Sequence, residues 1–186
     1  MKQLPEQPRI APLPADAGKP GRLNIFDTLR RNPGLYKGFL SLGGYLLGDG
    51  CLPAREREIV ILRTGWRCGC EYEFGQHTRI GAAAGLSPEE IGRLASESHG
   101  GWADDDATLL AAVDEMCGDT SISGPTWQRL TTRWNEPALL ELLVLIGFYR
   151  LVSGLLNGVG VALEADAAGW PPEVTSLRRA PRDPQP

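Results

Sequence analysis

The sequence lacks a signal peptide, an uninterrupted membrane-spanning stretch and a basic face that could bind a polyanion. Its first residues, MKQLPEQPRIAPLP, contain no apolar core of signal-peptide length, and its longest apolar stretch, from Leu139 to Leu156, is interrupted by Glu141 and Arg150. Acidic and basic residues are interspersed and give a net charge of −4, so no basic face is expected. These absences predict a cytoplasmic protein that has neither a membrane nor nucleic acid as a partner.

Cysteine and histidine are also scarce, with four and two residues respectively. Without an export signal, a disulfide framework is not expected. A zinc site would need more ligands, at clearer spacing, than Cys68, Cys70 and His77 supply. Cys51 and the second histidine do not add to them, because they fall outside any compact ligand pattern. We therefore expect no metal and no other cofactor, and we interpret Cys51 and Cys117 as small buried residues.

The composition, with 42% hydrophobic residues in 186, suits one domain with a core of its own. Residues 1–22 contain five prolines and few large apolar side chains, which predicts an extended N-terminal arm that could lie on a neighbouring subunit. Residues 171–186 are similarly rich in proline and charge, which predicts a flexible C-terminal tail. The functional domain should therefore span residues 23–170.

Apolar residues recur at three- and four-residue steps along this domain, whereas no alternating strand pattern of useful length is present. The pattern predicts an all-α domain of about six to eight helices. The clearest local signal is Ser87-Pro88-Glu89-Glu90, which combines a capping serine, a first-turn proline and a glutamate that can close a capping box. The expected helices cover residues 24–31, 33–47, 53–67, 70–85, 88 onward, 105–117, 125–134 and 136–164.

One helix carries an unusual set of reactive side chains. Cys70, Glu73 and His77 are separated by three and four residues, so a helix places them on one face. Glu58 lies on the preceding helix, and the short connection at Cys68-Gly69 should fold the two helices together. A second carboxylate could then meet the first.

Two carboxylates and an imidazole in a water-poor pocket can act as general acid and base, because burial and mutual repulsion raise the pKa of one carboxyl group while the other stays ionised. The alternative is purely structural. Glu73 and His77 would then be an i,i+4 pair on a solvated helix face, and Glu58 would pair with Arg55 or Arg63. The spacing alone does not separate the two interpretations.

A family resemblance adds to this interpretation. The segment from Leu52 to Ala95 resembles the signature region of the carboxymuconolactone decarboxylase and alkylhydroperoxidase D-like family, whose redox members show Glu, eleven residues, then Cys-x-x-Cys-x-x-x-His. Glu58, Cys70 and His77 match that spacing, and WNEPALLELLVLIGFYRLVSGLLNGVGVALE resembles the closing helix of the family. The resemblance implies an alkylhydroperoxidase D-like helical domain that forms a homo-oligomer, either a trimer or a hexamer, with the site at or near a subunit contact.

The departure from the motif bears directly on function, because Glu73 occupies the position of the second cysteine. A two-thiol cycle at that position is impossible, so the resemblance favours the decarboxylase-like branch, which lacks this cysteine. The other well-known activity in the family is cofactor-free decarboxylation of a lactone acid. We therefore expect a cofactor-independent lyase that acts on a small oxygenated carbon acid or lactone, with Glu73 and His77 moving protons and Glu58 assisting.

Other residues are candidates for holding the substrate. Arg63 or Arg79 could grip a substrate carboxylate, and the aromatic rings of Trp66, Tyr72 and Tyr149 could line a pocket. Two alternatives stay open. One is a thiol-dependent peroxidase or disulfide reductase that uses a Cys70 thiolate favoured by a helix N-terminus and by the nearby histidine, and the other is a non-catalytic binding protein on the same fold.

Overall fold

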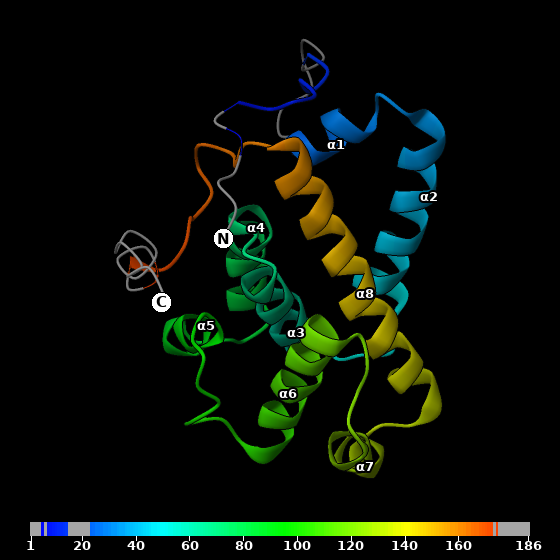
Figure 1. Ribbon diagram of the computed structural model, residues 1–186, viewed down its shortest axis with the longest axis vertical. Coiled ribbons are helices and arrows are strands. Elements are labelled where there is room, and N and C mark those ends of the chain that lie inside the picture. Colours follow the sequence, from blue (N-terminus) through cyan, green and yellow to red (C-terminus); the bar gives the residue numbers. More distant parts are fainter. Residues whose placement is uncertain (1–4, 6, 15–22, 173, 175–186) are drawn as a thin grey trace, which may run out of the picture.

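The computed structural model describes residues 5, 7–14, 23–172 and 174 of the chain, and within them it is helical without a strand (Figure 1). This confirms the all-α prediction. The helices, with one π-helical segment labelled η1, are α1 (Asn24–Leu29), α2 (Pro33–Gly44), η1 (Tyr45–Asp49), α3 (Ala54–Arg67), α4 (Glu71–Ala83), α5 (Pro88–Leu94), α6 (Asp104–Asp119), α7 (Gly124–Arg133) and α8 (Glu136–Val159).

Several helices begin where a nearby side chain accepts a hydrogen bond from a free backbone N–H group of the first turn. Asn32, Ser123 and Asn135 cap α2, α7 and α8 in this way, and a proline stands at the first or second position of each helix. Ser87 and Glu90 form the expected reciprocal capping box at α5. The predicted starts at these four sites are therefore correct to within one residue.

Two helix ends differ from the predictions by three residues or more. The predicted helix over 33–47 changes to π-helical geometry at Tyr45. The last helix ends at Val159, five residues before the predicted end, because Gly160 adopts a left-handed conformation with φ 76°. Pro53, expected inside the first turn of α3, instead stands at the N-cap position.

Helix α3 forms the centre of the molecule and packs against α4, α5, α6 and α8. Eight consecutive residues, from Glu58 to Gly65, are buried, so α3 presents no solvent face along this length. Its β-branched cluster, Ile59–Ile61, is fully buried. In Figure 1, α8 runs diagonally across the molecule, with α2 on one side of it and α3 and α4 on the other.

By length and composition, α8 could cross a membrane. However, 56% of its apolar window is buried inside the protein, which is the behaviour of a core helix in a soluble helical domain. Its charged residue Glu141 is also buried, and it accepts hydrogen bonds from the backbone N–H groups of Cys51 (2.7 Å) and Leu52 (3.0 Å). This contact anchors the segment that leads into α3.

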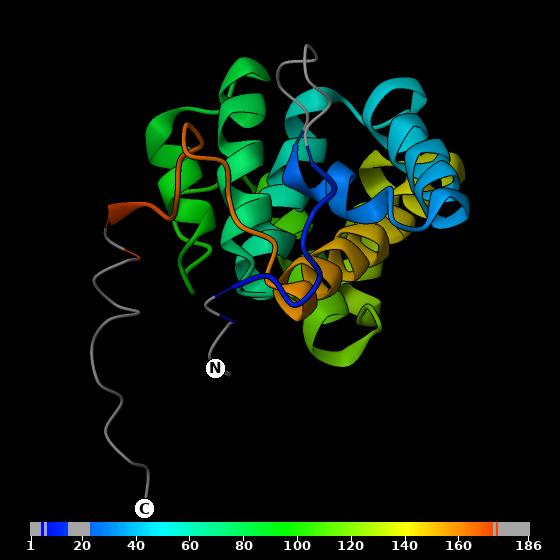
Figure 2. The same ribbon diagram turned by 90° about the horizontal axis from the view of Figure 1, so that it is seen from above.

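The described part of the N-terminal arm contacts its own chain. The backbone N–H of Arg9 donates to the carbonyl of Val159 at 2.7 Å, and that of Leu13 donates to the carbonyl of Asp27 at 3.1 Å. Figure 2 shows this segment beside the C-terminal end of α8. The rest of the predicted arm and most of the predicted flexible tail, residues 1–4, 6, 15–22, 173 and 175–186, lie outside the described residues.

Candidate active site

Glu58 of α3 and His77 of α4 meet in the interior of the protein. The Nδ1 atom of His77 lies 2.7 Å from the Oε2 atom of Glu58. The connection through Cys68 and Gly69 turns the chain back so that α4 lies along α3, as expected. Gly65 allows this close approach, because a β-carbon there would lie 3.3 Å from both the Glu73 side chain and the Phe74 backbone nitrogen.

Glu73 completes the cluster from the other side of the imidazole. Its Oε2 atom lies 3.7 Å from the Nε2 atom of His77, which is near but too long for a direct hydrogen bond. The exposed fractions of Glu58, Glu73 and His77 are 0%, 5% and 6%. These values exclude the interpretation in which Glu73 and His77 form an ion pair on a solvated helix face.

Burial and charge together perturb the titration of this cluster. Burial, together with the nearby charge of Glu58, raises the pKa of Glu73 from 4.5 to about 7, against the opposing effect of His77. Burial alone would lower the pKa of His77, but the hydrogen bond with Glu58 and the charges of both carboxylates raise it above 6.5. The cluster therefore contains groups that exchange a proton near neutral pH.

Tyr149 of α8 contacts the cluster. Its ring packs edge-on against the His77 imidazole, with ring centroids 5.1 Å apart. Burial and the charges of Glu73 and Glu58 raise the pKa of Tyr149 well above 10, so the phenol stays neutral. Its aromatic ring provides an apolar wall beside the histidine.

Arg57 is a member of the site that the sequence analysis missed. Its Nε atom lies 3.6 Å from Glu58 Oε1, and both atoms are buried without a hydrogen-bond partner among the described residues. The guanidinium also acts electrostatically on His77 and Tyr149. Arg57 therefore places a positive charge with unused hydrogen-bonding capacity beside the cluster.

Cys70 lies close to the cluster, but its environment opposes thiolate formation. Cys70 is the N-cap residue of α4 and is fully buried. Burial, with a contribution from the charge of Glu73, raises the pKa of the Cys70 thiol to about 12, even though the backbone of Glu73 and the hydroxyl of Ser153 stabilise the thiolate. The expected low-pKa thiolate at this helix N-terminus is therefore corrected, because desolvation exceeds the effect of the helix end.

The structure does not bring Arg63 to the cluster. Its buried guanidinium contacts Asp114 through two hydrogen bonds of 2.8 and 2.6 Å, and it also donates to the carbonyl groups of Leu94 and Ser96. His99 joins the same network, with its Nε2 atom 2.9 Å from Asp114. Arg63 is therefore occupied with joining α3 to α6, and it is not available for a substrate carboxylate.

The remaining predicted binding residues also lie apart from the cluster. The hydroxyl of Tyr72 donates to Glu164 at 2.8 Å and accepts from the backbone N–H of Ile25, so Tyr72 has a structural role. Arg79 is exposed. Trp66 lies under the Arg63 guanidinium at 4.5 Å. In addition, Cys51 is exposed and Cys117 is only half-buried, which corrects their interpretation as small buried residues.

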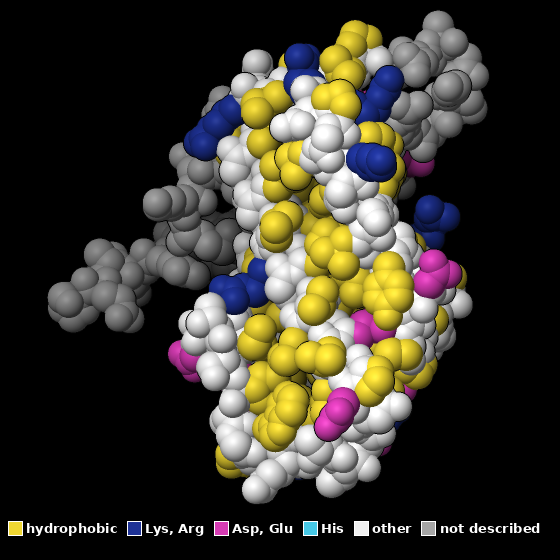
Figure 3. All heavy atoms as spheres, turned by 90° about the vertical axis from the view of Figure 1, so that its right-hand side faces the viewer, with side chains coloured by type: hydrophobic (Ala, Val, Ile, Leu, Met, Phe, Trp, Pro, Cys, Tyr) yellow, Lys and Arg dark blue, Asp and Glu magenta, His cyan; other side chains and the backbone are white. Residues whose placement is uncertain are grey.

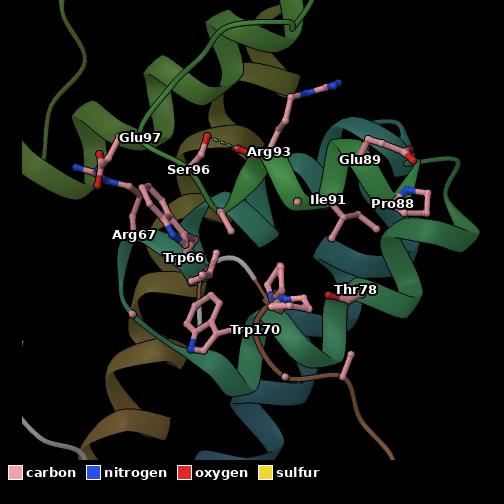
Figure 4. Close-up of a pocket in the computed structure, with 18 of the residues that line it drawn as sticks. Trp66, Arg67, Thr78, Pro88, Glu89, Ile91, Arg93, Ser96, Glu97 and Trp170 are labelled. Atoms are coloured by element: carbon pink, nitrogen blue, oxygen red, sulfur yellow. Dashed lines mark hydrogen bonds and ion pairs between the residues drawn. The ribbon is translucent and has the colours of Figure 1, made fainter. Parts of the chain in front are cut away.

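A cavity of about 1360 Å³ lies away from the Glu58–His77–Glu73 cluster (Figure 4). It opens between the end of α3, α4, α5 and the segment that follows α8, and its lining includes Trp66, Arg67, Cys68, Arg93 and Trp170. Trp66 therefore lines this cavity and not the predicted pocket around the histidine. Among the described residues, no group of three or more His, Cys, Asp and Glu side chains has an arrangement that could hold a metal ion.

Several solved structures share this fold. They include a peroxidase-related protein from Silicibacter sp. TM1040 (14% identity, TM-score 0.71, 79% of this chain and 79% of that chain covered). A second is the alkylhydroperoxidase AhpD core of a peroxidase-related protein from Ralstonia eutropha JMP134 (18% identity, TM-score 0.69, 85% and 82% covered). A third is the debrominase Bmp8 in complex with 2,3,4-tribromopyrrole (14% identity, TM-score 0.69, 78% and 79% covered). Because the sequence identities are low, these similarities establish only that the fold is shared.

A protein-family model matches part of the chain. No curated protein matches the chain. However, residues 33–114 match the model of the carboxymuconolactone decarboxylase family, and this span contains Glu58, Cys70, Glu73 and His77. This part of the chain is therefore similar to the carboxymuconolactone decarboxylase family, and the described structure has an alkylhydroperoxidase D-like fold.

Proposed function

We propose that the protein is a cofactor-independent lyase of the decarboxylase type that acts on a small oxygenated carbon acid or lactone. The observation that supports this proposal is the buried Glu58–His77–Glu73 cluster, in which the pKa of Glu73 is raised to about 7. A carboxyl group with this pKa can both donate and accept a proton at neutral pH. Similarity to the carboxymuconolactone decarboxylase family and to the fold neighbour Bmp8 makes an enzymatic role reasonable.

In this proposal each member of the cluster has a separate task, for which the geometry is the support. Glu58 accepts a hydrogen bond from His77 Nδ1 and so directs the Nε2 atom toward Glu73. When the substrate loses carbon dioxide, the electron pair of the broken carbon–carbon bond passes to the adjacent oxygenated carbon framework. The neutral carboxyl group of Glu73 then donates its proton to carbon, His77 restores the proton to Glu73, and His77 takes up one proton from water to complete the cycle.

Arg57 is the residue that we propose to hold the substrate. Its Nε atom lies 3.6 Å from Glu58 Oε1 and has no hydrogen-bond partner among the described residues, so it can donate to an anionic oxygen of the substrate. The ring of Tyr149 packs against the imidazole and adds an aromatic wall to the cluster. This combination suits a small acid with an anionic end and an apolar or ring-shaped body.

The proposal is tested by turnover of small lactone acids and keto acids, with carbon dioxide release and product formation as the two measurements. Glu73→Gln keeps the shape of the side chain but removes its proton transfer, so we expect turnover to fall by about 10²–10⁴-fold. Glu71→Gln is the matched control, because Glu71 stands on the same helix and is exposed. Full activity in Glu73→Gln would contradict the assignment of this residue.

The two alternative functions make different predictions in the same assay. A thiol enzyme based on Cys70 requires that Cys70→Ser abolish the activity, and the raised pKa of Cys70 argues against this outcome. A non-catalytic binding protein requires that neither Glu73→Gln nor His77→Gln change any measured conversion.

We also propose that the protein forms a homo-oligomer. Exposed apolar side chains gather on the face shown in Figure 3, which α2, η1 and one side of α8 provide. These residues are Leu35, Leu40, Leu42, Tyr45, Leu47, Leu140, Val144 and Leu151. A contiguous apolar surface of this kind is typical of an interface between subunits.

A further inference from the structure

The segment that follows α8 is fixed on α4 by three contacts. A β-carbon at Gly75 of α4 would collide with the carbonyl oxygen of Ala168, so only glycine lets the segment pass this close to the helix. The backbone N–H of Trp170 donates to the Glu71 carboxylate at 3.1 Å. The indole of Trp170 also packs on the ring of Phe74, with ring centroids 5.0 Å apart. This indole is therefore held at a defined place beside α4.

The Trp170 indole forms part of the wall of the cavity of about 1360 Å³. Trp66, at the end of α3, lines the same cavity, and Figure 4 shows both indoles within the lining. Thr78 of α4 and Ile91 of α5 lie on another side of the lining in the same view. Both tryptophan side chains are half-buried, so each indole has a surface that a bound molecule can cover. Aromatic and aliphatic walls of this kind suit a flat apolar body.

Arg67 provides a positive charge at one end of the cavity. Its guanidinium lies 5.4 Å from the ring centroid of Trp66. It pairs with Glu97 at 3.0 Å and lies 3.6 Å from Asp114. The Glu97 side chain is 82% exposed, and an ion pair with such an exposed carboxylate contributes little to stability. The anionic group of a ligand can therefore replace Glu97 at this guanidinium.

The other charged residues of the lining favour the same orientation of a ligand. Arg93 also lines the cavity, but its guanidinium stacks over Trp102 at 5.0 Å and points away from the two indoles in Figure 4. Glu89 lies at the other end of the cavity from Arg67 (Figure 4). The cavity therefore has a cationic end and an anionic end, with the aromatic walls between them.

We propose that the cavity binds a planar aromatic carboxylate, whose carboxylate group pairs with Arg67 and whose rings pack against Trp66 and Trp170. The cavity volume exceeds the range of about 300–1,000 Å³ that is usual for sites of small organic molecules, so two fused rings fit. In this orientation the negative charge of the ligand lies at the cationic end and is kept away from Glu89. The association is non-covalent and needs no other reactant.

This site is separate from the Glu58–His77–Glu73 cluster and does not rest on the proposed lyase activity. No residue of the cluster lines the cavity. The wall that Trp170 provides also lies beyond residues 33–114, the span that the family model matches. The second indole is therefore a feature of this chain, and it does not follow from the similarity to the family.

The experiment titrates 2-naphthoate into the full-length protein, with isothermal titration calorimetry as the measurement. We expect one site per chain and an affinity about tenfold higher than that of the uncharged analogue 2-naphthamide, because only the acid forms the charged contact with Arg67. Arg67→Gln should remove this difference. Glu97→Gln should raise the affinity for 2-naphthoate, because it removes the exposed carboxylate that competes for the guanidinium.

Removal of one indole tests the aromatic wall. Trp170→Ala should lower the affinity for both ligands by about tenfold or more. Trp127→Ala is the matched control, because Trp127 is an exposed residue of α7 that does not line the cavity. Glu73→Gln should bind 2-naphthoate as the wild type does, whereas a loss of binding in this variant would place the ligand in the lyase site and contradict the cavity.

Three other results would overturn the proposal: no binding of 2-naphthoate at millimolar concentration, equal affinity in the wild type and Trp170→Ala, or equal affinity for the acid and the amide. If Trp170→Ala does not fold, a crystal of the wild-type protein soaked with 6-bromo-2-naphthoate decides the matter through the anomalous signal of bromine. The bromine atom should lie in the cavity that Trp66 and Trp170 line. A bromine position outside this cavity would contradict the site.

Discussion

At the scale of single residues, Glu73 has the most consequential environment in the protein. It stands at the position of the second cysteine in the redox motif that the sequence resembles. It is also buried beside His77 and Glu58. A carboxyl group in such a place is driven toward its neutral form, because desolvation and the nearby carboxylate both disfavour a second negative charge. This effect has a measurable consequence for stability.

The first prediction concerns the pH dependence of unfolding. The folded-state pKa of Glu73 is raised from 4.5 to about 7, so its stabilising contribution is complete below pH 4.5 and is lost as the pH rises through about 7. The pKa of His77 is also raised, so its contribution is complete below pH 6.5 and is lost at higher pH as well. Glu73→Gln removes the first contribution. At pH 8 the variant should be more stable than the wild type by on the order of 3 kcal/mol at most.

Urea denaturation at pH 5, 7 and 8.5 measures this difference. The variant should match the wild type more closely at pH 5 than at pH 8.5, and its stability should vary less with pH. Glu97→Gln serves as the control, because the Glu97 side chain is 82% exposed. Equal pH dependence in the wild type and Glu73→Gln would show that Glu73 is not perturbed in the folded state.

The sequence could predict this cluster, because helical spacing selects Glu73 and His77 and the family motif selects Glu58 and His77. It could not choose among the arginines of α3. Residues 58–65 are buried around the whole helix, so periodicity does not show which arginine faces the carboxylates and which faces another helix. The partner of Arg63 is Asp114, which is 51 residues away, and such a long-range pair leaves no local signal.

At the scale of helices, the contact between α3 and α6 depends on this Arg63–Asp114 pair. Arg63 has no exposed surface, whereas the Asp114 side chain is 20% exposed. Removal of the carboxylate leaves a buried guanidinium without its counter-charge. The pair also holds the ends of α3 and α6 that carry Cys68 and Cys117.

The second prediction is that Asp114→Ala lowers the free energy of unfolding by roughly 3 kcal/mol, the low end of the range for breaking a buried pair. The matched control is Asp105→Ala on the same helix, because Asp105 is 61% exposed and pairs with Arg133 at the surface. Its cost should stay under about 1 kcal/mol. Equal losses in the two variants, measured by urea denaturation, would show that burial of Arg63 does not determine the energy of this contact.

The helix boundaries show how far local rules extend. Starts with Asn or Ser caps and an early proline could be predicted, because each cap is a contact within four residues. The end of α8 was predicted less well, because several glycines in this helix are compatible with continuation and only Gly160 adopts the left-handed conformation at the helix end. Local sequence alone does not distinguish these glycines.

At the scale of the whole molecule, exposed apolar side chains are unevenly distributed over the surface. On α8, Leu140, Val144 and Leu151 are exposed at spacings of four and seven residues, which forms a stripe along one side. Figure 3 shows a face of the molecule on which apolar side chains gather, and we propose that this face is the subunit interface. The presence of the stripe also explains why α8 is apolar on both its buried and its exposed sides.

The third prediction is that the wild-type protein assembles in solution and that Leu140→Glu combined with Leu151→Glu produces monomers. Two buried charges without partners would oppose association at an apolar contact. Light scattering after size-exclusion chromatography measures the mass. Trp127→Glu, which alters an exposed apolar residue on α7, should leave the assembly intact. A wild-type protein that is monomeric at high concentration would contradict the proposed interface.

The most direct test of the central claim is the titration of Glu73 in the folded protein by carbon-13 NMR of its side-chain carboxyl group, assigned with Glu73→Gln. A midpoint near pH 7, coupled to the titration of the His77 ring, would show a buried group that exchanges its proton at neutral pH, as the proposed acid–base chemistry requires. A midpoint at or below 4.5, with His77 titrating independently, would show an ordinary ionised carboxylate and would contradict the proposed function.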